Sequence, residues 1–159
     1  MAPFSIFLFC FTISFHPLYP FAIPTNTIAV NQTLKDGQTI VSPKRTFELG
    51  FFSPGNTSKN RYLGIWYKRQ ATGTVAWVAN RETPIKNNSG ELTLLPNGVL
   101  VLRDSTTDTI VWSTQKRSSR RPPVARLLDS GNLMVIDDDE DDDNQPENYI
   151  WQSFDHPGD

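Results

Sequence analysis

Few residues of this chain have the types and spacing that chemistry at a site requires. His156 follows Asp155 directly, and a histidine beside a carboxylate is half of the arrangement that activates a nucleophile. Neighbouring residues on a strand point to opposite faces of the sheet, so we do not expect this pair to form the bond that a catalytic triad needs. The only cysteine, Cys10, lies in the N-terminal apolar segment, and the sequence holds no glycine-rich phosphate loop. We therefore predict no catalytic residue and no enzyme.

Two charged runs are the other conspicuous clusters. Asp137–Asp143 holds seven of the 17 acidic residues, and Lys116–Arg121 is a basic run. Carboxylates are ligands for Ca²⁺, but these adjacent ones lack the spacing and the glycine turn of a built cation site. We interpret both runs as solvated loops and predict no metal and no cofactor. For Lys116–Arg121, a patch for anionic glycans or a membrane surface is the alternative.

The N-terminal segment predicts export. Phe4–Phe15 is almost continuously apolar; it is shorter than the roughly 20 residues that span a bilayer, but it is typical of a secretory signal peptide. We expect a signal peptide over 1–22, a single domain over 23–159, a secreted product and no membrane span. Glycosylation is then expected at three sequons, Asn31, Asn56 and Asn87, each near a turn signal.

The elements that must position any site are short strands. Leu92–Asp104 reads LTLLPNGVLVLRD, and Ala125–Asp137 reads ARLLDSGNLMVID. Both have an apolar run, a turn containing Gly98 or Gly131, and a second apolar run, which is typical of a β-hairpin. Each copy is followed by a tryptophan-containing strand, ending at Ser113 and Ser153. This repetition predicts internal symmetry.

The rest of the chain extends the same pattern. Turn signals recur every 6 to 12 residues or so, which predicts about ten to twelve strands and no long helix. Ser42–Phe51 fits a weaker third copy when it is laid against Leu128–Asp137. We therefore expect three repeats of the same chain to pack around a shared tryptophan core. The expected strands outside the two hairpins are 23–28 (or an extended lead-in), 39–41, 46–52 with an interruption at Gly50, 61–69, 74–80, 109–113 and 149–154.

Seven segments carry a resemblance to a known family. In chain order they are FELGFFSPG, RYLGIWYK, VAWVANRETPI, LTLLPNGVLVL, IVWST, ARLLDSGNLMV and IWQSFDHPGD. They resemble bulb-type (monocot mannose-binding) lectin domains, above all the domain that opens plant S-locus glycoproteins and G-type lectin S-receptor-like Ser/Thr protein kinases. The resemblance covers 25–159. It implies an all-β fold, the β-prism II, with three four-stranded sheets and pseudo-threefold symmetry.

The resemblance also implies candidate carbohydrate-binding positions. Lectins of the family bind mannose with the pattern Gln-x-Asp-x-Asn-x-Val-x-Tyr, whose polar residues we expect on one face of a strand at period two. Only Asn132 and Val101 keep the family residue, so most hydrogen-bonding groups are lost. The candidate site residues are Ser130, Asn132, Met134, Asn97, Val99 and Val101. The full pattern falls on Leu128, Ser130, Asn132, Met134 and Ile136 in the last copy, on Leu95, Asn97, Val99, Val101 and Arg103 in the middle copy, and on Ser42, Lys44, Thr46, Glu48 and Gly50 in the first.

The function implied by the resemblance is a non-catalytic, extracellular carbohydrate-recognition module like the lectin ectodomain of a plant S-domain receptor-like kinase. A soluble mannose-binding defence lectin, a structural dimerisation unit and a truncated or decoy product are the alternatives. Expected partners are a glycan, a cell-wall or protein ligand, and a homodimer or a receptor partner. Nucleic acid is not expected.

Overall fold

The computed structural model describes residues 26–55, 57–69, 73–115, 121–137 and 149–157. Over these residues the chain forms twelve strands and one short 3₁₀ helix. The elements are β1 (Thr27–Ala29), β2 (Thr33–Lys35), β3 (Thr39–Val41), β4 (Phe47–Phe52), β5 (Tyr62–Tyr67), β6 (Val75–Val78), β7 (Gly90–Leu94), β8 (Leu100–Asp104), β9 (Thr109–Ser113), β10 (Pro123–Leu127), β11 (Leu133–Asp137), β12 (Tyr149–Gln152) and η2 (Ser153–Asp155).

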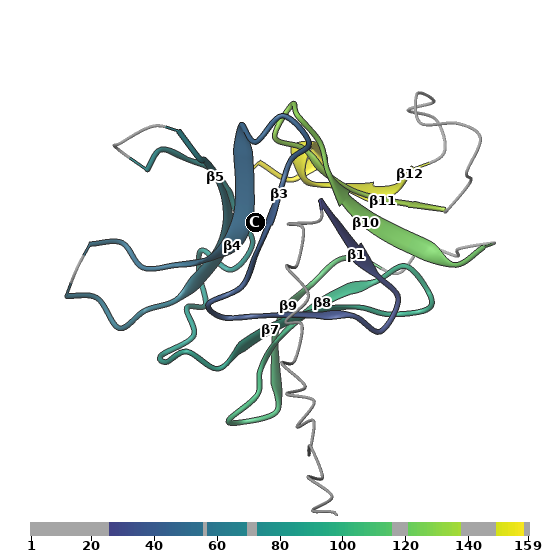
Figure 1. The fold of residues 1–159 in the computed structure, drawn as a ribbon. Helices are drawn as coiled ribbons and strands as arrows, with labels where there is room; N and C mark the ends of the chain where they lie inside the picture. Colours follow the sequence, from purple (N-terminus) through teal and green to yellow (C-terminus); the bar gives the residue numbers. More distant parts are fainter. Residues whose placement is uncertain (1–25, 56, 70–72, 116–120, 138–148, 158–159) are drawn as a thin grey trace, which may run out of the picture.

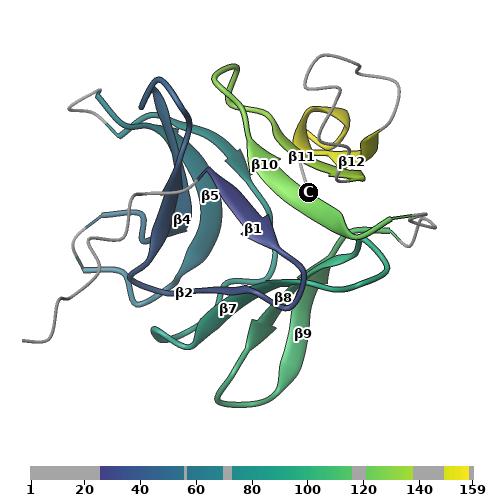
Figure 2. The ribbon, with the colours of Figure 1, turned by 45° about the vertical axis from the view of Figure 1, so that its right-hand side comes forward.

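The strands form three antiparallel sheets of four strands each, with the orders β3-β4-β5-β6, β2-β7-β8-β9 and β1-β10-β11-β12. The three sheets surround a common centre (Figure 1). The N-terminal strands do not form a sheet of their own, because β1 lies beside β10 and β2 beside β7 (Figure 2). The predicted three-sheet, all-β architecture is confirmed. Within the part of the chain that the structure describes, no helix has the length and apolar character needed to cross a membrane.

The core is built by alternation along the inner strands. In β7 and β10, and in β8 and β11 up to their last residue, every second residue is buried, as expected for strands with one face toward a core. These inward residues are almost all leucine, alanine and valine, and their relative exposure is 0%. The set is Leu92, Leu94, Leu100, Leu102, Ala125, Leu127, Leu133 and Val135. Packing of these aliphatic side chains from two sheets, continued by β4 and β5 from the third, makes one core.

A tryptophan triad links the three sheets. Trp77 of β6, Trp112 of β9 and Trp151 of β12 have ring centroids 5.8–5.9 Å apart, with interplanar angles of 64–73°. Edge-to-face contact places the positive edge of one ring against the negative face of the next, and each such pair contributes about 0.5–1.5 kcal/mol beyond its burial. The expected shared tryptophan core is therefore present, and it is made by three of the four tryptophans in the chain.

The structure places the third copy of the repeat in a different segment from the one that the sequence alignment predicts. The pairing register shifts after Ile65, Leu102 and Val135, which makes β5, β8 and β11 the equivalent strands. The first copy of the carbohydrate pattern was predicted at Ser42–Gly50, in β4 and the turn before it. That prediction is wrong, because β4 is the equivalent of β7 and β10. The connection 53–61 between β4 and β5 is longer than the connections 95–99 and 128–132, so the repeated turn signature is missing there.

Three local predictions also need correction. β4 runs through Gly50 without interruption, because Gly50 pairs with Gly64 across the sheet. The last strand ends at Gln152 rather than Phe154, and the chain turns there into the 3₁₀ helix. The strand β2 is absent from the prediction, because TLK lacks the β-branched pair that marked the equally short β3.

One buried ion pair fixes the connection between the sheets. Arg61 donates from Nε to Asp36 Oδ2 at 2.7 Å and from Nη2 to Asp36 Oδ1. The same guanidinium donates to Ser53 Oγ and to the Phe51 carbonyl, both at 3.1 Å. The Asp36 side chain is 2% exposed and that of Arg61 19%. Hydrogen bonding to Asp36 raises the pKa of Arg61 above its ordinary value. The β2–β3 turn is thereby tied to β4 and β5.

Candidate functional site

The two turns that carry the predicted carbohydrate residues have the same hydrogen bonds. In the middle copy, the Leu95 N–H donates to the Val99 carbonyl at 2.9 Å, and in the last copy the Leu128 N–H donates to the Asn132 carbonyl at 2.9 Å. Gly98 (φ 79°) and Gly131 (φ 86°) occupy the left-handed position in each turn, which a residue with a side chain adopts only at a cost in free energy. The structure therefore confirms the repeated hairpin.

The polar positions of the pattern lie in these turns rather than on a strand. Only Met134 and Val101, with the positions after them, fall within β11 and β8. The Ser130 hydroxyl oxygen accepts the Asn132 N–H at 3.3 Å, and Asn97 Oδ1 accepts the Val99 N–H at 3.3 Å. The expectation of three polar residues on one strand face is thus wrong. In both copies the side chain at the family's aspartate position caps its own turn.

Asn132, which keeps the family residue, is 5% exposed and held by three contacts. Its Oδ1 accepts the Ser153 hydroxyl at 3.0 Å and the Phe154 N–H at 3.3 Å. Its Nδ2 donates to Gln152 Oε1 at 2.8 Å. A carbonyl oxygen has two lone pairs, so the acceptor capacity of this amide is used within the chain. Asn132 fastens the turn to η2.

Each sheet has an equivalent hydrogen bond from a backbone N–H to the side chain of a residue that follows its last strand. The Leu133 N–H donates to Ser153 Oγ at 3.0 Å, and the Leu100 N–H donates to Thr114 Oγ1 at 3.0 Å. In the third sheet the Leu63 N–H donates to Asn80 Oδ1 at 2.8 Å. These side chains satisfy a buried backbone donor at the start of β5, β8 and β11. Asn132 supports one of these contacts by accepting the Ser153 hydroxyl. Its counterpart Val99 is 8% exposed, and its side chain has no polar atom.

The third equivalent of the pattern lies on β5, where the sequence alignment did not place it. In that register Tyr62, Gly64 and Trp66 correspond to Asn132, Met134 and Ile136. The two aromatic side chains are half-buried. The alternating aromatic residues of RYLGIWYK predict a strand, and the structure places Tyr62 and Trp66 on this face of it.

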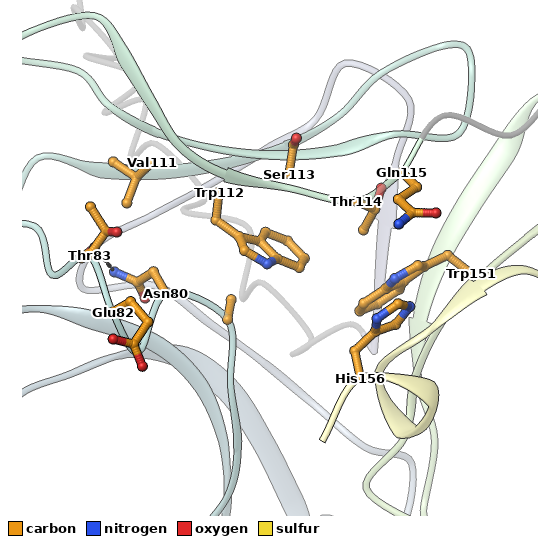
Figure 3. A pocket seen from close by; sticks show the side chains of 11 residues that line it. Asn80, Glu82, Thr83, Val111, Trp112, Ser113, Thr114, Gln115, Trp151 and His156 are labelled. Carbon is orange, nitrogen blue, oxygen red and sulfur yellow. Dashed lines mark hydrogen bonds between the residues drawn. The ribbon is translucent and has the colours of Figure 1, made fainter. Parts of the chain in front are cut away.

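A cavity of about 390 Å³ opens beside the tryptophan triad, between the ends of three sheets (Figure 3). Trp112 and Trp151 form its aromatic side, and Glu82, Thr83 and Gln115 contribute polar groups.

The His156 ring stacks on Trp151 in this cavity, with centroids 5.6 Å apart and planes inclined by 14°. The His156 carbonyl accepts the Trp77 indole N–H at 2.9 Å. His156 therefore packs the end of the chain onto the triad.

The reason expected for excluding Asp155 and His156 as a catalytic pair, opposite faces of one strand, does not apply. Asp155 lies in η2 and not on a strand. Its Oδ1 accepts the Gln152 amide at 2.9 Å, and its Oδ2 accepts the Tyr149 hydroxyl at 3.3 Å. The carboxylate is thus engaged with β12.

One carboxylate of the middle sheet has a shifted pKa. The Ser89 hydroxyl donates to Asp104 Oδ1 at 2.6 Å, and the Thr106 N–H donates to the same oxygen at 2.9 Å. These donors, Ser89 first, hold the pKa of Asp104 below its ordinary value because they stabilise the ionised form. The contacts close the β8–β9 turn onto the loop before β7, so the shift has a structural cause.

The remaining predicted sites are only partly within the described residues. Asn31 and Asn87 are exposed, and Asn31 has φ 62° in the β1–β2 turn. Asn56, the signal peptide 1–22 and most of both charged runs lie outside the described residues. Among the residues described, no cluster of three or more histidine, cysteine or acidic side chains is arranged to hold a metal ion.

Comparison with known proteins assigns the family. The sequence profile of the D-mannose binding lectin family matches residues 74–159, more than half of the 159 residues. A G-type lectin S-receptor-like serine/threonine-protein kinase of Arabidopsis thaliana is 47% identical over 132 residues, which are 83% of this chain and 15% of the kinase. The chain thus spans only a small share of that relative's length.

Solved structures show the same fold. A lectin of Marasmius oreades aligns with a TM-score of 0.57 at 15% identity, over 81% of this chain and 90% of that one. The mannose-specific agglutinin of snowdrop (Galanthus nivalis), solved with methyl-α-D-mannoside, aligns with a TM-score of 0.53 at 16% identity, over 72% and 91%. With its three four-stranded sheets and the family profile over most of their length, the chain belongs to the D-mannose binding lectin family and is a bulb-type lectin domain.

Proposed function

We propose that this domain is a non-catalytic recognition module that acts outside the cell and binds a glycan other than free mannose. The observation that carries the proposal is the state of Asn132. It is the one hydrogen-bonding residue retained from the mannose pattern, and both lone pairs of its Oδ1 are taken by Ser153 and Phe154. A sugar hydroxyl that donates there has to break a bond within the chain.

The neighbouring positions do not replace the lost groups. Leu128 and Leu95 stand where the family has glutamine, and neither offers a donor or an acceptor. The oxygens of Ser130 and Asn97 each already accept one backbone N–H group, so part of their hydrogen-bonding capacity is used within the chain. With glutamine replaced by leucine in both copies and the acceptor of Asn132 occupied, too few groups remain free to exchange water for sugar hydroxyls, and these positions support little affinity for mannose.

The cellular context is also part of the proposal. The apolar segment Phe4–Phe15, the exposed sequons at Asn31 and Asn87, and the kinship with S-receptor-like kinases all favour an exported glycoprotein. Its ligand is then a glycan of the cell wall or of a glycoprotein, and a receptor partner or a second copy is the route to a signal. Loss of mass on enzymatic deglycosylation, reduced by Asn31→Gln and Asn87→Gln, tests the glycoprotein part.

The test of glycan binding uses the folded domain from residue 23 onward on a glycan array and on mannan-agarose, with snowdrop agglutinin as the positive control on the column. We expect binding to one or more array glycans that lack terminal mannose, and no retention on mannan that free mannose reverses. Mannose-reversible retention would establish the alternative, a mannose-binding lectin. A domain that is folded by circular dichroism but binds no glycan on the array would refute glycan recognition.

A further inference from the structure

An aromatic platform covers the outer face of the sheet β3-β4-β5-β6. We define it as Phe52, Tyr62 and Trp66. The Phe52 ring lies 5.8 Å from Tyr62 and 6.3 Å from Trp66, centroid to centroid, and the Phe52 and Trp66 planes meet at 64°. All three side chains are half-buried, so part of each ring faces solvent.

Two glycines bring the rings down onto the strands. Gly50 and Gly64 are paired in the middle of β4 and β5. A Cβ atom on Gly64 would lie 2.7 Å from Phe52 Cε1, and one on Gly50 would lie 3.1 Å from Trp66 Cη2. The rings therefore lie over the glycine backbone and leave a broad, low apolar surface.

A cavity of about 430 Å³ extends this surface. It is bounded by Phe52 and Trp66, by Pro54 and Gly55 of the β4–β5 connection, and by Val75 of β6, which is 37% exposed. A ring-sized ligand in this cavity contacts both aromatic walls, which are inclined to one another.

One ion pair lies at the margin of the platform. Glu48, opposite Trp66 in the ladder, forms this pair with Lys68 at 3.1 Å and accepts the Thr39 hydroxyl at 2.7 Å. The pair itself adds no net charge beside Trp66. The walls that a ligand meets are apolar rings, which suits a neutral ligand.

We propose that the aromatic platform is a stacking site for a neutral pyranose with equatorial hydroxyls, such as the residues of a β-linked glucan. In such a sugar the axial C–H groups form a flat, slightly positive face that matches the negative face of an aromatic ring. The axial hydroxyl of mannose interrupts one such face. This inference rests on the proposed function and names the ligand class and the sheet that binds it.

The platform also has a purely structural explanation, because aromatic rings can shield strand glycines from water. The two explanations differ in what happens when Trp66 is replaced by a smaller apolar residue. If the rings only shield the glycines, the substitution changes the unfolding midpoint and leaves glycan affinity as it was. If the rings bind the sugar, the substitution weakens glycan binding even where the unfolding midpoint is unchanged.

The experiment titrates cellohexaose and laminarihexaose into the domain by isothermal calorimetry, with mannohexaose for comparison. The variants are Trp66→Leu, which removes a wall, and Val75→Arg, which fills the cavity from an exposed position and spares the core. Phe154→Leu is the matched control, since Phe154 is an exposed aromatic (55%) outside the platform. Unfolding midpoints of all four proteins are measured in parallel.

We expect the wild type and Phe154→Leu to bind one of the two β-glucan hexasaccharides more tightly than mannohexaose, and both platform variants to weaken that binding about tenfold or more. If the wild type binds glycans on the array but neither β-glucan hexasaccharide, or if Trp66→Leu and Val75→Arg bind as the wild type does, the platform is not the site and the proposed function stands. If the wild type binds no glycan at all, both proposals fail.

Discussion

Removal of the Arg61 guanidinium is the perturbation whose effect on stability follows most directly from the structure. In Arg61→Met the apolar stem remains, but Asp36 loses both charged hydrogen bonds, and Ser53 Oγ and the Phe51 carbonyl lose one donor each. The Asp36 side chain, at 2% exposure, has no access to water that would replace them. An ionised carboxylate is then left buried without a partner.

The expected loss is about 3–5 kcal/mol, the range found when one member of a buried ion pair is removed. Arg103→Met is the matched control. Its ion pair with Asp108, at 2.8 Å, has side chains 43% and 81% exposed. An exposed pair of this kind contributes about 0–1 kcal/mol because water and salt screen it.

The assay is urea unfolding at pH 7 followed by tryptophan fluorescence, which reports the packing of the triad. With a slope of about 1–3 kcal/mol per molar urea, Arg61→Met should lower the midpoint by more than about 1 M, and Arg103→Met by much less. The double variant Arg61→Met with Asp36→Leu should recover part of the loss, since the orphaned charge is gone. A midpoint for Arg61→Met equal to that of Arg103→Met, or a double variant less stable than Arg61→Met, would refute the reasoning.

Three further predictions concern the last hairpin and the middle sheet. Asn132→Ala leaves a buried hydroxyl and a backbone N–H without their acceptor and should lower the free energy of unfolding by about 1–3 kcal/mol, whereas Asn97→Ala, at an exposed position of the middle copy, should lower it by less than half as much; equal losses in urea unfolding would contradict this. Gly131→Ala and Gly37→Ala both force alanine to positive φ (86° and 90°), but only at Gly131 would the new Cβ lie 2.8–3.0 Å from a phenylalanine ring; Gly131→Ala should therefore be the more destabilising by about 1–3 kcal/mol, measured as the difference in unfolding free energy. The lowered pKa of Asp104 means that its ionised form is favoured in the fold, so the stabilisation is present above the unfolded pKa of about 3.9 and is lost as the pH falls through the folded value; Asp104→Asn should be less stable than the wild type at pH 7, and the gap in unfolding free energy should close as the pH falls below the unfolded pKa.

The hairpins around Gly98 and Gly131 were predictable because tight turns restrict which residues fit. A glycine flanked by asparagine or serine between two apolar runs has few other uses, and the structure places both glycines at positive φ. The tryptophan triad was predictable for a related reason. A large aromatic residue that recurs after each hairpin must bury its surface at an equivalent place.

The third copy was misplaced because its turn lacks this restriction. The connection 53–61 is long, and its only glycine lies well before β5. Alignment by residue identity therefore favoured SPKRTFELGF over the true equivalent, which is this connection together with β5. The engagement of Asn132 was not predictable either. Its partners Gln152, Ser153 and Phe154 lie some twenty residues later and meet it because β12 pairs antiparallel with β11, with Gln152 opposite Met134. A site residue can be recognised by type from the sequence, but whether its hydrogen bonds are free is a tertiary property.

The distribution of β1, β2 and β3 among three sheets bears on how the chain comes to fold. β1 is made first, yet its partner β10 lies near the far end of the described chain. During synthesis from the N-terminus, β7–β9 can pair with local neighbours while β1 still presents an unpaired edge. The loop that this pairing closes is long, so it should be a late step with a high entropic barrier. The first of the described strands to be made, β1, is thus the last to find its partner. Until β10 is made, that edge stays open to pairing with another chain.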